Sequence, residues 1–406
     1  METVRADTPS APRRATYATR PDMPLGRFSA TIFKSLRRTD QRKWAHAYLK
    51  GLLATPGKKS VRRLATAISR DPSVAQSLRQ FVSLSPWDFD EVMEELTRWV
   101  ADRRPDPVWS IGRAVLPKRG DRSVGVHRYF DLSSGRTLNC QLGLGAFLRV
   151  GEAQLPVDWS LHLSTAWTQD SDRRRDARIP DGERYRPLWA AALGLVDRLS
   201  ARWDSPSSVV LADMSDEPDV AFLLHGLAKR KRDFVVAVPP HLAVLPAAEG
   251  LLAPVNARTL FPAQRPEPAV GPPPGEERRV TRPQTSLVHL AGDLPGRAPG
   301  PPYRLLTETD PFGAPGPLWI TSLAHLTLAE VGSITALHTG TTETIGSLEQ
   351  DFGLLDFEGR SFPGWYHHMA LVSAAYTYRR LHYPTAAPSP PAQRVPHQRP
   401  QPLPPS

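Results

Sequence analysis

The spacing of apolar residues changes along this chain, and that change limits the folds the sequence can adopt. Across residues 41–100 apolar side chains recur every three or four positions, as on one face of a helix, and Gly57, Pro72 and Pro86 interrupt the pattern. From residue 108 onward the apolar residues form short runs separated by turn sequences, which is typical of strands. The sequence therefore predicts a helical region followed by a sheet.

Three apolar runs open the sheet region, in the order VWSIGRAVL, SVGVHRYFDL and TLNCQLGLGAFLRV. The short turn sequences KRGDR and SSGR separate them, so neighbouring runs are expected to pair as an antiparallel meander. A helix is expected at about 187–202, a strand at SSVVLADM, a helix at about 217–230 and a strand at DFVVAVPP. Because strands that alternate with helices form parallel pairs, the sequence predicts an α/β fold with a mixed sheet.

This order of elements resembles the ribonuclease-H-like fold, which many nucleases and transposases share. The resemblance implies an N-terminal helical domain at 27–105, a core whose first part spans 106–240, and closing helices within 319–383. The Pro- and Gly-rich segment 241–318 is predicted to be an insertion before the last helix, with short strands such as SLVHLA and YRLLTE.

The two ends of the chain lack the composition of a folded core. Residues 1–26 carry prolines and scattered charges, and residues 384–406 hold nine prolines in 23 positions, so both are expected to be a disordered arm and tail. No apolar run approaches the roughly 20 residues that span a bilayer, and the first residues do not resemble a signal peptide. We therefore expect a cytoplasmic protein. The single cysteine, Cys140, excludes an internal disulfide and a cysteine-based zinc site, and is expected in the core.

The net charge of +10 favours a polyanionic partner such as DNA. Only eight of the 51 basic residues are lysine, and an excess of arginine is also typical of compositional bias in coding sequences, so the charge is compatible with DNA and does not establish it. In the helical region Lys58, Lys59, Arg62 and Arg63 cluster near one helix start. They are predicted to contact phosphates, with a solvated basic patch as the alternative.

Five blocks of sequence run in order over about three quarters of the chain. They are SLRQFVSLSPWDF (77–89), LPKRGDRSVGVHRYF (116–130), NCQLGLGAFLRV with PVDWSLHL (139–162), VVLADMSDEPDVAFLLHGL (209–227) and DFGLLDFEGRSFPGWYHHMALVSAAYTY (351–378). Together they resemble one group of bacterial insertion-sequence transposases, the seven-oh-one type of the DDE superfamily. The resemblance implies DNA transposition, with DNA element ends as the partner and a homo-oligomer on DNA.

In that family two aspartates and one glutamate bind two divalent metal ions, conventionally Mg²⁺, for in-line phosphoryl transfer. The acids come from the first strand, the end of the fourth strand and the last helix. Asp213 follows SSVVLA and matches the fourth-strand position, so the resemblance makes it a catalytic metal ligand. A residue that ends a strand or caps a helix is the alternative for Asp213 and more strongly for Asp216.

The first-strand position does not hold an acid. Counting back from Pro117 and Lys118, which match the family motif, places Gly112 and Arg113 where two adjacent acids are expected. A guanidinium stays protonated and offers no lone pair to a metal. The nearest acids, Asp106 and Asp121, lie several residues away along a strand, too far to substitute. Lys118 is also predicted to contact DNA.

The last-helix position also departs from the family. Counting back from FEGRS places the family glutamate at Thr342, and Glu343 is a weak candidate because one residue turns it about 100° around a helix. Glu349 shares the side of position 342 but lies about 10 Å further along. The stretch HTGTTETIGS is a poor helix interior. His367 and His368 are adjacent, so they would point apart on a helix, and we expect them to be packing residues rather than metal ligands.

With one of three acids in place, the sequence favours a DNA-binding transposase relative that has lost strand cleavage. An active transposase with displaced carboxylates, a domesticated DNA-binding or regulatory protein and a decayed gene product are the alternatives. We also hypothesise that Arg113 pairs with Asp213 and takes the place of the metal ions.

Overall fold

The computed structural model describes residues 23–131, 135–203, 205, 207–247, 253–262, 282–291, 301–309 and 315–382. Nearly all of the predicted N-terminal arm and all of the predicted C-terminal tail lie outside these residues, as does much of the Pro- and Gly-rich segment. Within the described part of the chain, no helix combines the length and the hydropathy needed to span a membrane.

The N-terminal region is helical. The four helices that the sequence predicts there are α2 (Thr39–Ala54), α3 (Val61–Ile68), α4 (Ser73–Ser83) and α5 (Phe89–Ala101), and a further helix, α1 (Leu25–Ile32), precedes them. Ser60 and Asp88 cap α3 and α5 by accepting hydrogen bonds from free backbone N–H groups of the first turn. Only α1 was not expected, and it begins two residues inside the predicted arm.

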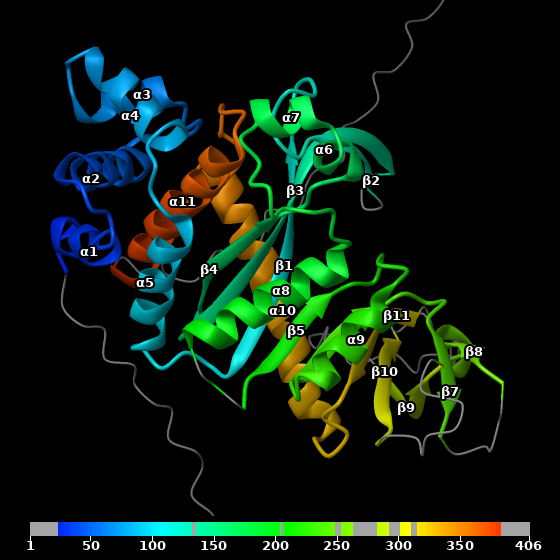
Figure 1. Cartoon of the computed structure of the whole chain (residues 1–406). Coiled ribbons are helices and arrows are strands. Elements are labelled where there is room, and N and C mark those ends of the chain that lie inside the picture. The colour runs from blue at the N-terminus through cyan, green and yellow to red at the C-terminus, as the bar shows by residue number, and fades with distance from the viewer. Residues whose placement is uncertain are drawn as a thin grey trace, which may run out of the picture.

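These helices pack around α11 (Phe362–His382), the last described helix (Figure 1). Phe28 of α1 meets Tyr378 of α11 with ring centroids 5.2 Å apart, and the Tyr48 hydroxyl of α2 lies 3.3 Å from Nδ1 of His368. Most of α11 is buried, so one hydrophobic core runs from the N-terminal helices into the sheet. The N-terminal helices and the closing helix therefore stabilise each other.

Within the described residues, eleven strands form one mixed sheet. Its centre is built from β1 (Val108–Pro117), β3 (Arg136–Val150), β4 (Ala153–Leu161), β5 (Val209–Asp213) and β6 (Asp233–Val238). β3 pairs antiparallel with β1 and with β4, whereas β5 pairs parallel with β1 and with β6. Three antiparallel strands followed by parallel strands with crossover helices is the order that the sequence predicts.

The predicted meander is wrong in its pairing, because the second run, SVGVHRYFDL, does not lie between the other two: β1 pairs with β3, and β4 pairs with β3 on its other side. Within the described part of the second run, His127–Asp131 forms a strand, β2, which pairs with the first residues of β3. Gly125, at φ 77°, turns the chain just before it. β4 contains Pro156, which has no N–H for the ladder and lies beside a register shift against Phe147. This interruption hid β4 from the period-two pattern.

The described part of segment 241–318 continues the same sheet. β11 pairs antiparallel with β6, and β10, β9 and β7 follow it outward. The elements are β7 (Ala243–Pro246), β8 (Val255–Asn256), a 3-10 turn η1 (Ala257–Leu260), β9 (Arg282–Leu290), β10 (Tyr303–Thr309) and β11 (Pro315–Thr321). The strands expected at SLVHLA and YRLLTE are therefore present, and they widen the sheet.

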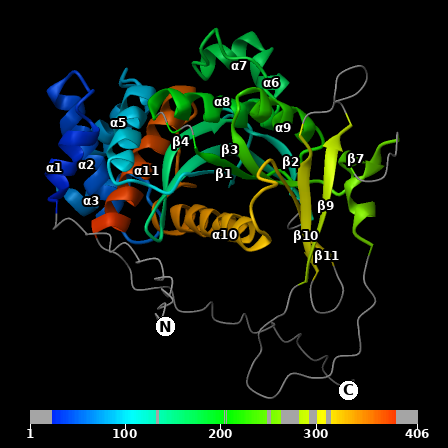
Figure 2. The same ribbon diagram turned by 90° about the horizontal axis from the view of Figure 1, so that it is seen from below.

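Helices cover both faces of the central strands (Figure 2). The long helix α10 (Leu328–Asp351) crosses one face beneath β1 and β5, and α8 (Leu188–Arg202) and α9 (Val220–Lys229) cover the other. Two short helices, α6 (Thr165–Thr168) and α7 (Ser171–Asp176), follow β4. Because α10 packs against β1 and β5, its side chains surround those that the two strands direct to this face.

α10 is continuous through HTGTTETIGS, where the sequence predicts a poor helix. The hydroxyls of Thr341 and Thr342 donate to carbonyl oxygens one turn earlier, at 3.2 Å each, so neither hydroxyl lacks a hydrogen-bond partner. Thr344, which is buried, lies 3.1 Å from the Tyr376 hydroxyl of α11. Burial against the sheet and α11 therefore outweighs the low local propensity.

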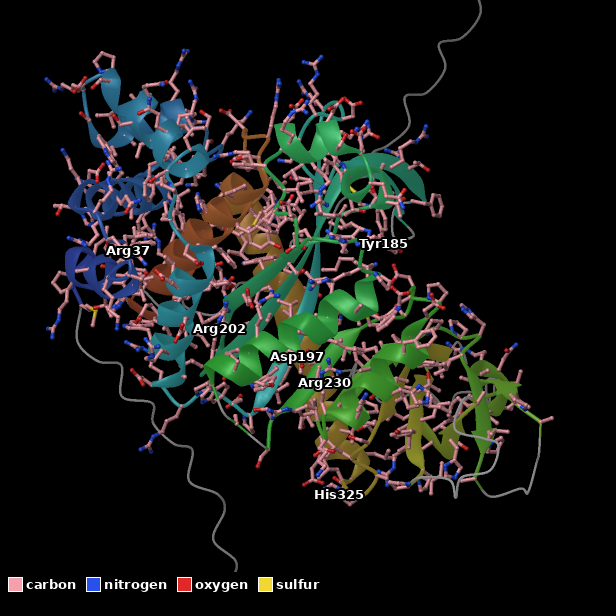
Figure 3. The ribbon with its side chains drawn as sticks, in the orientation of Figure 1. Arg37, Tyr185, Asp197, Arg202, Arg230 and His325 are labelled. Atoms are coloured by element: carbon pink, nitrogen blue, oxygen red, sulfur yellow. The ribbon has the colours of Figure 1, made fainter. Side chains whose placement is uncertain are left out.

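Ion pairs anchor α8 on both sides (Figure 3). Arg202 lies 2.9 Å from Asp158, a carboxylate on β4 with no exposed surface. At the other side Asp197 pairs with Arg230, just beyond α9, at 2.6 Å. These contacts fix the ends of the crossover helices next to the first residues of β5 and β6, at the opposite edge of the sheet from Asp213.

Candidate functional site

Gly112 of β1 and Asp213 of β5 lie side by side and face α10. The parallel pairing places Ile111 opposite Ala212, so the next residue of each strand is also adjacent. A Cβ atom at Gly112 would lie 2.8 Å from Cδ1 of Ile345 and 2.8 Å from Cγ2 of Thr341, both on α10. The space that a side chain would need at Gly112 is therefore filled by the helix.

Asp213 has a different partner on the same helix. Its Oδ2 lies 3.4 Å from Nε2 of His338, and its Oδ1 accepts a hydrogen bond from the Ser215 N–H at 3.0 Å. The two side chains keep 37% and 28% of their surface exposed. The Asp213 carboxylate is thus solvent-accessible, with a histidine beside it rather than a second carboxylate.

Arg113 points to the opposite face of the sheet, because successive side chains of a strand alternate. Its guanidinium donates to both carboxylate oxygens of Asp216, at 2.6 and 2.5 Å, and to the Tyr129 hydroxyl of β2 at 3.2 Å. The hypothesis that Arg113 pairs with Asp213 is therefore wrong. Asp216 takes that role, and of the two neighbours only Gly112 shares a face with Asp213.

The Arg113–Asp216 pair is a partly buried, bidentate ion pair. Its side chains are 21% and 16% exposed. Burial by itself lowers the pKa of Arg113, but the hydrogen bonds and the negative charge of Asp216 outweigh it, so the pKa is raised above the ordinary value. The pair holds the middle of β1 to the loop that follows β5.

No acid of α10 is directed toward Asp213. His338, Thr341 and Ile345 form the side of the helix that faces the sheet, whereas Thr342 is exposed. Glu343 is exposed and lies about 140° around the helix from His338. Glu349 lies three turns beyond His338, and burial raises the pKa of its carboxyl. The structure therefore brings neither candidate glutamate to the site.

A two-metal site does not fit these residues. In the described ranges, no three His, Cys, Asp or Glu side chains cluster closely enough to hold a metal ion. Divalent ions such as Mg²⁺ need several oxygen ligands, and here Asp213 supplies one carboxylate while side chains of α10 fill the space beside Gly112. Asp106 pairs with Arg149 at 3.4 Å, and Asp121 is exposed in the loop after β1, so neither replaces it.

A comparison with models of protein families shows to which family the chain belongs. The model of a family described as DDE superfamily endonuclease matches residues 31–291, well over half of the sequence. The chain belongs to this DDE family. Among solved structures, a piggyBac transposase synaptic complex with hairpin DNA is similar over 87% of this chain and 70% of that one, with 12% identity and a TM-score of 0.39. Similarity at that level does not establish a shared fold. No curated protein matches the sequence.

Two of the lysines predicted to bind DNA in this DDE-family protein instead hold the loop between α10 and α11. Nζ of Lys118 donates to the carbonyl oxygens of Leu355 and Phe357, at 3.2 and 3.0 Å, and burial lowers its pKa to about 8. Lys59 is buried, its backbone N–H donates to Asp356 at 2.6 Å, and its Nζ donates to the Thr55 carbonyl. Neither ammonium group is available to a phosphate.

The other predicted basic residues remain on the surface. Lys58, Arg62 and Arg63 are exposed at the start of α3, and Arg63 also donates to the Pro56 carbonyl at 2.9 Å. Of the predicted residues, this leaves Lys58 and Arg62 as exposed cations on which a phosphate contact can be tested.

His367 and His368 are packing residues, as predicted. Both are buried. The ring nitrogens of His367 lie 3.0 and 2.8 Å from the carbonyl oxygens of Val82 and Trp87, and its ring stacks on the Trp87 indole. Nε2 of His368 lies 2.8 Å from the Gly353 carbonyl, and burial lowers its pKa to about 4. They join α11 to its neighbours.

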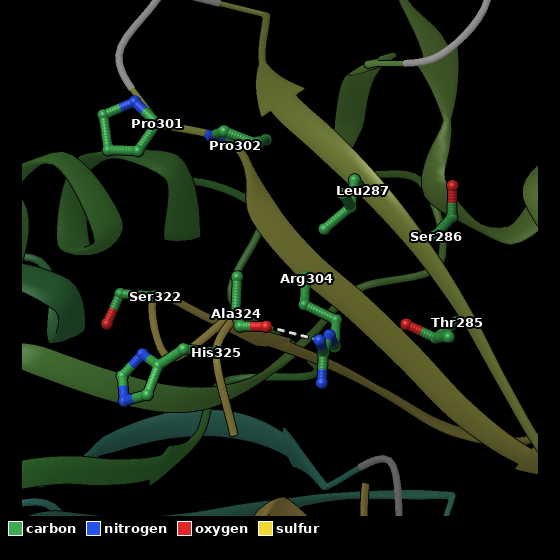
Figure 4. A pocket seen from close by; sticks show the side chains of 9 residues that line it. All are labelled: Thr285, Ser286, Leu287, Pro301, Pro302, Arg304, Ser322, Ala324 and His325. Atoms are coloured by element: carbon green, nitrogen blue, oxygen red, sulfur yellow. Dashed lines mark hydrogen bonds between the residues drawn. The ribbon is translucent and has the colours of Figure 1, made fainter. Parts of the chain in front are cut away.

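A hollow lined by β9, β10 and the loop after β11 is shown in Figure 4. Arg304 crosses it and donates to the carbonyl oxygens of Ala324 and Leu326. None of its lining residues is an acid, so the hollow offers no carboxylate to a metal ion. The hollow is therefore not a candidate site for DDE-type metal-dependent chemistry.

The sequence did not single out His338, Tyr129 or Asp216 as contacts of the family positions. One signal was available, because His338 precedes Thr341 by three residues and the two therefore share a side of a helix, but nothing in the sequence shows that this side faces Asp213. The Asp216 contact had no local signal, since it joins residues 103 positions apart.

Proposed function

We propose that this protein is a transposase relative of the seven-oh-one type, with a ribonuclease-H-like core, that binds DNA of a mobile element and does not cut it. The pairing of β4, β3, β1, β5 and β6 supports that core. The proposed protein is cytoplasmic, associates with the nucleoid when bound to DNA, and forms a homo-oligomer on the element ends.

The close contact between Gly112 and α10 carries the proposal. Two-metal phosphoryl transfer needs carboxylates that hold both ions against the attacking and leaving oxygens. At the position beside Asp213, two side chains of α10 already occupy the volume that a carboxylate would take. Binding to DNA needs no such acids, because phosphate contacts come from exposed cations.

Cleavage is tested with the full-length protein and labelled duplexes carrying the element termini, in Mg²⁺ or Mn²⁺. We expect no cleavage above the background of an Asp213→Ala variant. If the unaltered protein cuts the termini and Asp213→Ala abolishes the cut, displaced carboxylates complete the site and this part of the proposal is wrong.

DNA binding is tested by gel shifts at several salt concentrations, with element ends and unrelated DNA. We expect Lys58→Ala combined with Arg62→Ala to weaken binding and to reduce the salt dependence by about one phosphate contact for each residue. Lys229→Ala, at the exposed end of α9, is the matched control. Equal affinity for element ends and unrelated DNA would favour a domesticated, non-specific DNA-binding role, and no binding at low salt contradicts both.

A further inference from the structure

β2 and the first residues of β3 form a two-stranded ribbon at the edge of the sheet (Figure 1). Its two sides differ. His127 and Tyr129 are half-buried on the side that contacts the body of the protein, whereas Arg128 and Phe130 are exposed on the other. Phe130 keeps 53% of its surface exposed, and its cross-strand neighbour Thr137 is also exposed.

The exposed side of the ribbon continues the face of the sheet that carries Asp213. Gly112, which faces α10, pairs with Gly145 of β3. Side chains two, four, six and eight residues away along a strand share a face, so Asn139 and Thr137 of β3 share that of Gly145. Arg128 and Phe130 pair with these two residues. Between Gly145 and the ribbon this face is covered, because Gln141 is buried beneath the Val124 carbonyl, whereas Asn139 and Thr137 are exposed.

The charge around Phe130 suits a nucleic acid. Residues 117–139 contain five basic and two acidic side chains, and Arg119, Arg122 and Arg128 are exposed. Only Lys118 of the five is directed inward, toward the α10–α11 loop. An aromatic ring among exposed cations is the combination by which proteins track a phosphate backbone and stack on bases.

Hydrogen bonds from the body of the protein hold the ribbon in place. The Val126 carbonyl, just before β2, accepts from Nε1 of Trp167 at 2.8 Å, and the Val124 carbonyl accepts from Nε2 of Gln141 at 2.6 Å. The Tyr129 hydroxyl accepts from Arg113 at 3.2 Å. Phe130 is thus an exposed ring on a fixed support, so little ordering is needed when a ligand binds.

We propose that the exposed side of this ribbon contacts DNA, and that Phe130 stacks on an unpaired base while Arg128 contacts the adjacent backbone. The inference deepens the proposed function and rests on it. Bases inside an intact duplex are already stacked on both sides, so a protein ring reaches a base face only at an unpaired or single-stranded position. The ribbon would therefore recognise distorted DNA next to the face that carries Asp213.

The test uses full-length protein and two 20-base-pair duplexes, one intact and one with a single unpaired 2-aminopurine. We expect the protein to quench 2-aminopurine fluorescence and to prefer the unpaired duplex. Phe130→Ala should remove the quenching and weaken binding to the unpaired duplex about tenfold, with intact-duplex binding unchanged. Phe130→Trp should retain both properties. Arg128→Gln should weaken binding to both duplexes and reduce the salt dependence by about one contact.

Leu84→Ala is the control, because Leu84 is equally exposed, at 62%, but lies after α4. If the unaltered protein binds the intact duplex and Phe130→Ala behaves like it on both duplexes, this inference is overturned while the proposed function stands. If the protein binds neither duplex at low salt, both fail. If Phe130→Ala changes only the mass measured by light scattering, the ribbon is a protein contact, and the inference is again overturned.

Discussion

Gly112 and Arg113 are neighbours in sequence but belong to opposite faces of the sheet, and the two faces are closed in different ways. Behind Gly112 the atoms of Ile345 and Thr341 fill the space. Behind Arg113 a bidentate pair with Asp216 balances a charge that is mostly withdrawn from water. One face is closed by packing, and the other by electrostatics.

The difference separates two adjacent residues that the sequence analysis considers together. Only the Gly112 face also carries Asp213, so the glycine, and not the arginine, bears on metal binding. The positive charge of Arg113 is the more conspicuous feature of the sequence, but it belongs to a contact between the middle of β1 and the loop after β5. Substitutions on the two faces are therefore expected to differ in how much they lower the free energy of unfolding, in the pH dependence of that loss and in the second substitution that restores stability.

The largest effect is expected from restoring an acid on the packed face. Gly112→Asp forces a carboxylate into space occupied by α10 and should lower the free energy of unfolding by about 3 kcal/mol or more, without producing cleavage. Combining it with Ile345→Ala should recover part of that loss, measured by denaturant unfolding. If the Gly112→Asp protein is as stable as the unaltered protein, the side chains of α10 move aside at little cost and the face is not closed.

The second effect concerns α11, which helps to support the packed face. His368 has a folded pKa of about 4, against about 6.5 when unfolded, so the unfolded state binds more protons between these values. Stability should fall as pH drops through this window, by about 2 kcal/mol from His368 between pH 7 and pH 5. His368→Gln should flatten the pH dependence of thermal unfolding. An unchanged slope in that variant would remove His368 as the cause.

A smaller effect is expected from breaking the ion pair on the other face. Asp216→Asn leaves the Arg113 guanidinium without its charge partner and should cost about 1 to 2 kcal/mol, less than a fully buried pair because both side chains remain partly exposed. Changing Arg113 to Met in the same protein should restore most of the loss. A double-mutant cycle measures the coupling, and a coupling near zero would contradict the electrostatic account.

The smallest effect is expected at Asp213, which the sequence predicts to be a metal ligand. Its contact with His338 is long and accessible to water, so Asp213→Asn should change the free energy of unfolding by less than about 1 kcal/mol. The matched comparison is Asp216→Asn, three residues away, on the opposite face. A loss at Asp213 as large as that at Asp216 would erase the distinction between the two faces.

Much of the fold could be predicted from the sequence because its elements carry strong local patterns. The helices of residues 39–101, the crossover helix α8 and the strand ending at Asp213 follow from apolar spacing and turn residues. β4 could not, since Pro156 breaks its alternation, and α10 seemed too weak a helix because its stability comes from packing on distant strands.

The candidate site was only partly within reach of sequence reasoning. Counting from Pro117 and Lys118 placed Gly112 on the strand beside Asp213, where the structure also has it. The Asp213 partner predicted for Arg113 was wrong, because adjacent side chains of a strand alternate and Gly112 already faces the side of Asp213. The inward direction of Lys59 and Lys118 was missed as well, since it depends on a loop some 240 to 300 residues further along the chain.

The contacts between the N-terminal helices and α11 have a consequence for synthesis. Tyr48 meets His368 across 320 residues, and Lys59 meets Asp356 across 297. At about 5 to 20 residues per second, the first helices leave the ribosome on the order of 15 to 60 seconds before the helix that completes their core. During that interval their apolar sides have no native partner, so the nascent chain must stay unaggregated until nearly all of it has been made.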